Sequence, residues 1–162
     1  MGCLKLNFDG ATDVRNGVSG IGAVFRVHGI TRQAERCPGS SNQVGNLPPR
    51  AVESLAMLHG LRFALHVGFK KLEVEGDALT FLNVLNDSSD DHSSEGHILD
   101  EVKQLLKSFI SCSWRFVRRD CNKVAHRLAK EALKLSQPWW FISESGPSWL
   151  HQCVGMDFEC EV

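Results

Sequence analysis

The sequence lacks the features of membrane and secreted proteins. No apolar run approaches the roughly 20 residues that a membrane-spanning helix needs. The first residues carry neither the charged nor the long apolar segment of a secretory signal. The cysteines include no Cys-x-x-Cys pair, and His151, Cys153 and Cys160 have no partner at a spacing usable for zinc. These absences favour reduced thiols in a cytoplasmic or nuclear protein, with no membrane partner.

A strong net charge is also missing. The formal net charge of −1 argues against a protein that holds nucleic acid by bulk electrostatics alone. The charges are nevertheless uneven, because basic residues dominate between Arg115 and Lys134 and acidic residues dominate between Asn86 and Glu101. Without a motif, a solvated surface explains either cluster as well as a binding site does.

A chain of 162 residues can bury one core but is too short for two ordinary domains. Hydrophobic periodicity predicts the following strands: 4–9, 21–25, 30–37, 71–75 and 112–117. It predicts the following helices: 51–67, 77–85, 98–109 and 122–135. We expect a turn at Gly10, a loop over 38–49, and a side-chain cap from Asp77 on the second helix. A meander followed by strand–helix–strand crossovers predicts a mixed sheet with helices on its faces.

The last part of the chain differs in composition. Tryptophans and a phenylalanine follow Pro138, and Gly146-Pro147 interrupts any long helix. We expect residues 1–137 to form the domain and residues 138–162 to pack as an aromatic tail on its edge. A platform that stacks RNA bases is the less favoured alternative.

Three acids stand at related places in this pattern. Asp9 ends the first strand, Glu53 lies in the first turn of the first helix, and Asp77 follows the fourth strand. Each has an ordinary explanation alone, as a turn residue, a favourable helix-dipole charge or a helix cap. Parallel pairing of the first and fourth strands would instead bring all three to one edge. Carboxylates so close repel each other unless cations lie between them, and their oxygens suit Mg²⁺ or Mn²⁺.

The segments KLNFDGA, GIGAVFR, AVESLAMLHGLRFAL, KLEVEGDAL and RFVRRDCNKVAHRLAKEAL resemble the successive motifs of the ribonuclease H-like domain. The resemblance covers about residues 4–135 and is closest to the version found in plant genes and in non-LTR retroelement reverse transcriptases. It implies an α/β fold with a five-stranded mixed sheet flanked by helices. Strands one to three form an antiparallel meander, and strands four and five run parallel to strand one.

The resemblance also implies an activity, a metal-dependent hydrolysis of the RNA strand in RNA–DNA hybrids with Mg²⁺ or Mn²⁺ as cofactor. Asp9 would hold both ions, Asp77 the ion beside the attacking water, and Glu53 the ion beside the leaving oxygen. The implied nucleic-acid-binding residues are Gly10, Arg50, Arg119, Asn122, Lys123 and Arg127. The partners would be the hybrid and a tethered reverse transcriptase in a longer protein, and we expect a monomer.

The chain departs from the family pattern at His126, where the last helix usually carries a fourth acid. His126 is interpreted as a fourth catalytic metal ligand, as a non-ligating neighbour of a weakened site, or as a packing residue left after activity was lost. The basic protrusion that some family members carry between the second and third helices is replaced by the acidic segment within 86–101. The alternative to an enzyme is therefore an inactive nucleic-acid-binding or interaction domain. A nuclease for DNA junctions has no supporting substrate-reading feature here.

Overall fold

The computed structural model describes residues 4–27, 39–87, 93, 95–137 and 139–141. Its elements in chain order are β1 (Leu4–Asp13), β2 (Val18–Val27), β3 (Gly39–Gly45), α1 (Pro49–His66), β4 (Lys71–Gly76), α2 (Leu79–Asn86), α3 (Gly96–Leu106), β5 (Ser111–Phe116), the 3-10 turn η1 (Arg119–Cys121), α4 (Lys123–Ala132) and β6 (Trp139–Phe141). Among the described helices, none combines the length and the apolar character needed to span a bilayer.

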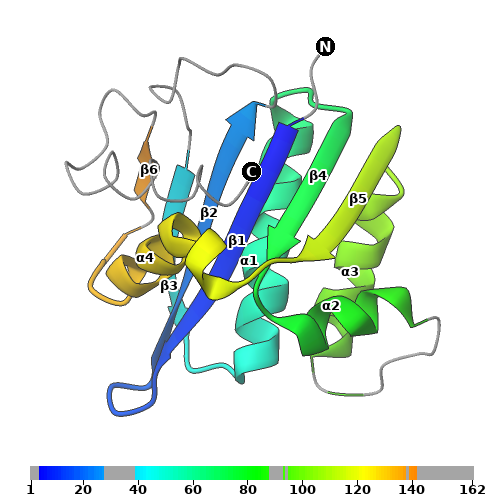
Figure 1. Ribbon diagram of the computed structural model, residues 1–162. Coiled ribbons are helices and arrows are strands. Elements are labelled where there is room, and N and C mark those ends of the chain that lie inside the picture. The colour runs from blue at the N-terminus through cyan, green and yellow to red at the C-terminus, as the bar shows by residue number, and fades with distance from the viewer. Residues whose placement is uncertain (1–3, 28–38, 88–92, 94, 138, 142–162) are drawn as a thin grey trace.

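One mixed sheet organises the fold, with strands in the order β5-β4-β1-β2-β3-β6 (Figure 1). β1, β2 and β3 form an antiparallel meander, while β4 runs parallel to β1 and β5 parallel to β4. The five-stranded sheet expected from the sequence is confirmed. β6 adds a short antiparallel strand outside β3. The rest of the expected tail lies outside the described residues, so the division of the chain at residue 137 stays a prediction.

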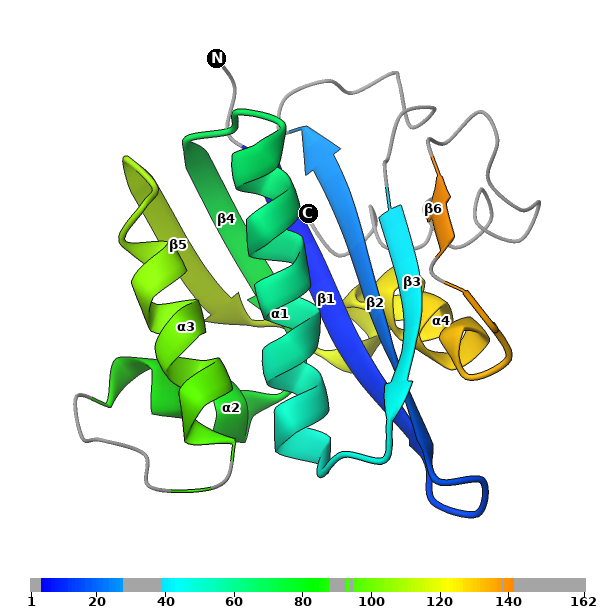
Figure 2. The ribbon, with the colours of Figure 1, turned by 180° about the vertical axis from the view of Figure 1, so that it is seen from behind.

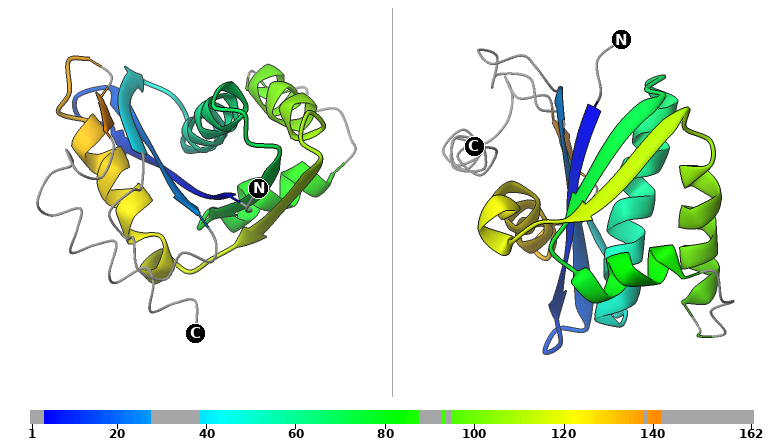
Figure 3. Two further views of the ribbon diagram at one scale, coloured as in Figure 1. Left: turned by 90° about the horizontal axis from the view of Figure 1, so that it is seen from above. Right: turned by 45° about the vertical axis from the view of Figure 1, so that its right-hand side comes forward.

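Helices cover the sheet on both faces, as Figures 2 and 3 show. Of the helices in the described part of the chain, α1, α2 and α3 lie on one face, and α4 lies on the other over β1, β2 and β3. Leu6 and Phe8 of β1 are fully buried in the core that α1 covers. Because side chains alternate along a strand, Asn7 and Asp9 point to the opposite face, toward α4. One strand thus contributes both to the core and to the polar face.

Glycines in β2 let α4 lie directly on the sheet. A Cβ atom at Gly20 would be 2.2 Å from the carbonyl oxygen of Ala129, and one at Gly22 would be 2.5 Å from that of Ala125. Such contacts are far inside van der Waals distance, so only glycine permits this approach. The close packing fixes how far His126, on the same helix, stands from β1.

Three local predictions were wrong. β1 continues through Gly10 to Asp13, and the chain turns afterwards with Gly17 at a positive φ of 65°. Gly10 is required instead by packing, because a Cβ there would be 2.7 Å from Cγ1 of Val52. β3 occupies 39–45, inside the predicted loop, and the strand predicted at 30–37 lies outside the described residues. α2 begins at Leu79 without a side-chain cap, so Asp77 does not cap it.

The cysteine prediction also needs correction. Cys112 is a free thiol, as expected. Cys121 is disulfide-bonded, whereas the sequence favoured reduced thiols throughout.

Candidate metal centre

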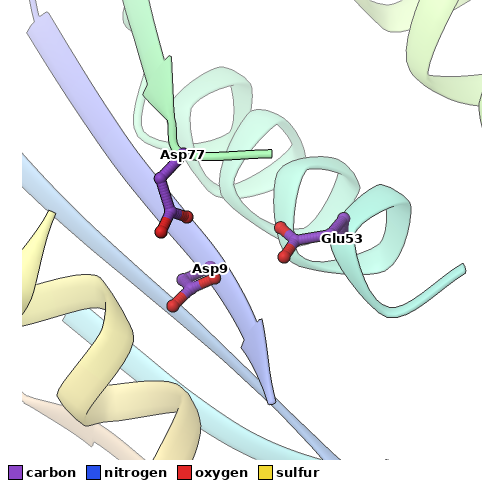
Figure 4. Close-up of side chains that lie close together, drawn as sticks. All are labelled: Asp9, Glu53 and Asp77. Carbon is purple, nitrogen blue, oxygen red and sulfur yellow. The ribbon is translucent and has the colours of Figure 1, made fainter. Parts of the chain in front are cut away.

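Asp9, Glu53 and Asp77 converge beside the end of β4, where β4 and β1 are neighbouring strands inside the sheet (Figure 4). One oxygen from each carboxylate lies within 4.8 Å of the other two. Strand pairing explains the meeting of the two aspartates, because β1 and β4 are parallel neighbours and Asp9 and Asp77 follow their paired residues Leu6 and Val74. α1 leads from the meander to β4 and carries Glu53 in its first turns to the same place. The convergence is the arrangement that the sequence predicted.

The electrostatics of this cluster favour a bound cation. Asp9 is completely buried, and Oε2 of Glu53 is buried without a hydrogen-bond partner among the described groups. Burial, followed by the charge of Asp9, raises the pKa of Glu53 to about 9. Burial and the charge of Asp77 also raise the pKa of Asp9, although the contact with His126 opposes the shift. A divalent ion between the carboxylates would remove this repulsion and give Oε2 of Glu53 a partner, so the residues present fit Mg²⁺ or Mn²⁺.

His126 reaches the cluster from α4. Its Nδ1 lies 2.5 Å from Oδ2 of Asp9, and its side chain is 22% exposed. The group whose ligand atoms all lie within 4.8 Å of one another consists of the three carboxylates. His126 therefore contacts the centre through Asp9, and its predicted role as a metal ligand stays a prediction.

Two residues from the segment before α4 hold the Asp77 carboxylate. Arg119 donates from Nε to Oδ2 over 2.8 Å, and Asn122 donates from Nδ2 to Oδ1 over 3.4 Å. The same amide of Asn122 donates to the carbonyl of Phe8 over 2.9 Å. Asp77, predicted to cap α2, thus accepts hydrogen bonds from side chains 42 and 45 residues away.

Asn122 was predicted to contact nucleic acid, but its side chain is completely buried. Besides its two bonds toward β1 and Asp77, it accepts a hydrogen bond from Asn7 over 3.3 Å. Its Oδ1 and Nδ2 are thus committed to partners inside the protein. The structure makes Asn122 a support for Asp77 and does not place it on the surface.

A buried polar network under the centre was missed by the sequence reasoning. Asn7 donates to Glu75 over 3.0 Å and accepts from Arg26 over 2.5 Å, and Lys5 forms a 3.3 Å ion pair with Glu75. Burial alone would raise the pKa of Glu75, but hydrogen bonds from Arg115 and Asn7 and the charge of Lys5 lower it below its ordinary value. The sequence signal for this network was the set of polar residues that alternate with apolar residues along β1. Such an alternation usually indicates that the polar face is solvated. Here α4 and neighbouring side chains cover it.

The other residues predicted to contact nucleic acid lie on β1, α1 and α4. Gly10 packs beneath Val52 and donates its N–H to Oδ1 of Asp9 over 2.9 Å. Arg50 and Lys123 are partly exposed at the starts of α1 and α4. Arg127 is exposed on α4 and pairs with Glu131 over 3.0 Å. Contact of these residues with nucleic acid stays a prediction.

Comparison with known proteins identifies the family. A family model described as reverse transcriptase-like matches residues 7–132. The chain belongs to the reverse transcriptase-like family. The match begins two residues before Asp9 and ends at the last residue of α4, so it contains all three carboxylates and His126. The retroelement type of domain expected from the sequence motifs is confirmed.

A curated relative and several solved structures support the same assignment. The chain is 27% identical over 140 residues to an Arabidopsis thaliana protein whose name provisionally describes a ribonuclease H protein. The alignment covers 84% of this chain but 21% of that protein, so the chain spans about a fifth of the relative's length.

The structures show the fold. Ribonuclease H1 from Halobacterium salinarum NRC-1 superposes with a TM-score of 0.73 at 25% identity, over 82% of this chain and 98% of that one. The N-terminal ribonuclease H domain of Rv2228c from Mycobacterium tuberculosis gives 0.72 at 20% identity, over 83% and 95%. A compost-derived ribonuclease H1 in complex with an RNA/DNA hybrid gives 0.68 at 16% identity, over 81% and 96%. The fold is therefore that of ribonuclease H.

Proposed function

We propose that this chain is a divalent-metal-dependent endoribonuclease that hydrolyses the RNA strand of RNA–DNA hybrids. The observation that carries the proposal is the convergence of Asp9, Glu53 and Asp77 on one point from three separate elements. Their mutual repulsion and the buried Oε2 of Glu53 support a role for cations there. The names of the relatives and the RNA/DNA hybrid bound to a protein of the same fold support the reaction and the substrate.

In this proposal each carboxylate has its own role in holding the metal ions. Asp9 would hold two ions, Asp77 the one beside the attacking water, and Glu53 the one beside the leaving oxygen. The ions would activate water and stabilise the departing oxygen. The protein's own contribution is orientation, because the N–H of Gly10 fixes Asp9 while the buried amide of Asn122 holds Asp77.

Recognition of the hybrid would depend on the RNA 2′-hydroxyl groups and on the phosphate backbone, without base readout. Arg50 at the start of α1, and Lys123 and Arg127 on α4, would offer positive charge suited to phosphates. Acids dominate the segment between Asn86 and Glu101, and they would repel a duplex. We therefore propose that the monomeric domain binds weakly and with strong salt dependence by itself, and that a tethered reverse transcriptase supplies further affinity.

A second candidate function has one observation in its favour. His126 stands where a fourth acid is expected and contacts Asp9 directly. This reduces the negative charge available to a second ion. The chain would then be a weakened or inactive nucleic-acid-binding or interaction domain with the same fold.

A cleavage assay separates the two candidates. Purified chain is incubated with a labelled RNA–DNA hybrid in Mg²⁺ and, separately, in Mn²⁺, beside Asp9→Asn and Asp100→Asn. Asp100 is an exposed acid of α3 outside the cluster. We expect cleavage of the RNA strand by wild type and Asp100→Asn but not by Asp9→Asn. Absence of cleavage in both metals supports the second candidate, and cleavage that persists in Asp9→Asn indicates a contaminating nuclease.

A further inference from the structure

Arg119 is a largely exposed side chain that bonds a largely buried carboxylate of the centre. Its guanidinium bonds Oδ2 of Asp77 over 2.8 Å, yet 68% of its side chain is exposed, against 5% for Asp77. The remaining oxygen of Asp77 accepts from Asn122. Both oxygens of this carboxylate are therefore engaged, one by a buried neutral amide and one by a solvated cation.

The two partners of Asp77 differ in what they would do to a metal ion. Asn122 is buried and uncharged, so it holds the carboxylate without opposing a cation. Arg119 places a positive charge within a hydrogen-bond length of an oxygen that the ion needs. A divalent ion and Arg119 therefore compete for the same negative charge.

We propose that Arg119 is a gate that couples nucleic-acid binding to metal binding. In the free protein Arg119 holds Oδ2 of Asp77, and when a backbone phosphate of the nucleic acid arrives Arg119 moves to it and leaves that oxygen to the ion. The inference rests on the proposed function, because it assumes that a phosphate backbone and a divalent ion meet at this centre. No covalent step is involved.

Physical chemistry supports the exchange of partners. A guanidinium binds phosphate through paired N–H donors at least as well as it binds a carboxylate. A largely exposed arginine side chain changes rotamer at little cost. A nucleic-acid strand that is cleaved beside Asp9 and Asp77 must also place phosphates within the reach of Arg119. If the phosphate releases Asp77, nucleic acid tightens metal binding, and by linkage metal tightens nucleic-acid binding equally.

A fixed orienting role is the competing explanation, and it predicts the opposite sign. If Arg119 only kept Asp77 in its metal-binding rotamer, its loss would weaken the metal site. If Arg119 is a gate, its loss strengthens metal binding in the absence of nucleic acid. Arg118 provides a matched control, because it is the adjacent exposed arginine and makes no ion pair with any described residue.

The decisive experiment measures Mn²⁺ binding to the full chain without nucleic acid, by titration calorimetry or electron paramagnetic resonance. We expect Arg119→Gln to bind Mn²⁺ several-fold more tightly than Arg118→Gln, and Arg119→Lys, which keeps the charge, to remain closer to wild type. Thermal unfolding of each variant checks that it is folded. Equal or weaker binding by Arg119→Gln than by Arg118→Gln overturns the gate.

A second titration tests the coupling. A native hybrid, mixed with the chain and Mn²⁺ and frozen for electron paramagnetic resonance before cleavage proceeds, supplies phosphates and keeps the 2′-hydroxyl groups on which recognition depends. We expect it to tighten Mn²⁺ binding by wild type more than by Arg119→Gln, and an equal effect on both overturns the coupling. Neither titration requires cleavage. A chain that cleaves no hybrid but shows both shifts therefore supports the gate and refutes the nuclease proposal.

Discussion

Nδ1 of His126 lies 2.5 Å from Oδ2 of Asp9, at the position on the last helix where the family resemblance predicts a fourth acid. The contact ties α4 to β1, and the glycines of β2 allow that helix to approach so closely. An acid at this position would add negative charge to the centre, whereas histidine adds none. The choice of residue at 126 therefore affects how strongly the centre binds its ions.

His126→Asp should increase activity with Mg²⁺. An added carboxylate beside Asp9 supplies a hard oxygen ligand and a negative charge, and in a partly buried site this is worth roughly tenfold in ion affinity. Cleavage of a labelled hybrid, measured across a Mg²⁺ titration, checks the expectation.

His126→Asn is the matched control for that titration, since it is polar and uncharged. It should not reproduce the gain of His126→Asp. Equal Mg²⁺ dependence in wild type and His126→Asp would show that charge at residue 126 does not limit the site.

Glu53 should make the stability of the protein depend on pH when divalent ions are removed. Its pKa is about 9 in the folded chain, against the ordinary 4.5, so the folded state holds the proton more tightly than the unfolded state. The stability that this tighter proton binding gives to the folded state is fully present below pH 4.5 and is lost as the pH rises through about 9. Denaturant unfolding in EDTA at several pH values measures it.

Glu53→Gln should flatten this pH dependence, because the side chain can no longer ionise, while Asp100→Asn should retain it. Adding Mg²⁺ should restore the stability of wild type at high pH and do little for Glu53→Gln. A wild-type stability curve that does not fall between neutral pH and pH 9 would contradict the account of the cluster.

Asn122→Ala should lower both the stability of the folded protein and its cleavage of the hybrid. The change removes three hydrogen bonds and leaves the buried groups of Asn7 and Phe8 without this partner, which costs about 2 to 3 kcal/mol. It also removes the hydrogen bond that holds Oδ1 of Asp77. Asn83→Ala, at an exposed position of α2, should change neither quantity. Chemical denaturation and the cleavage assay measure both, and an unaffected activity would show that Asn122 does not position Asp77.

Gly22→Ala should destabilise the fold by about 1 to 3 kcal/mol, because the new Cβ would meet the carbonyl oxygen of Ala125 at 2.5 Å and α4 would have to move. The displacement should also change the contact between His126 and Asp9. Gly45→Ala is the control, since nothing lies within 4 Å of a Cβ there. Equal thermal stability of the two variants would show that α4 does not depend on close approach to β2.

The carboxylate cluster could be predicted from sequence because it follows from strand order. Once β1 and β4 are parallel neighbours, Asp9 within β1 lies beside Asp77 just after the end of β4, and the helix joining the meander to β4 begins nearby. Short-range patterns locate these strands well because Leu4, Leu6 and Phe8 alternate with polar residues.

The partners of the cluster could not be predicted in the same way. Arg119 and Asn122 meet Asp77 across 42 and 45 residues, and no local pattern encodes such contacts. Asp77 looks like a helix cap from its neighbours alone, but tertiary hydrogen bonds take its oxygens. β3 was missed because glycine, serine and asparagine in its sequence favour a loop, whereas pairing along β2 makes it a strand.

The central claim is that Asp9, Glu53 and Asp77 hold a divalent ion, and anomalous diffraction at the manganese edge tests it most directly. Crystals of wild type and of Asp9→Asn are soaked in Mn²⁺ under identical conditions. The account predicts an anomalous peak among the three carboxylates in wild type and a lost or much weaker peak in Asp9→Asn. No peak there in wild type, or one of equal height in both crystals, would contradict it.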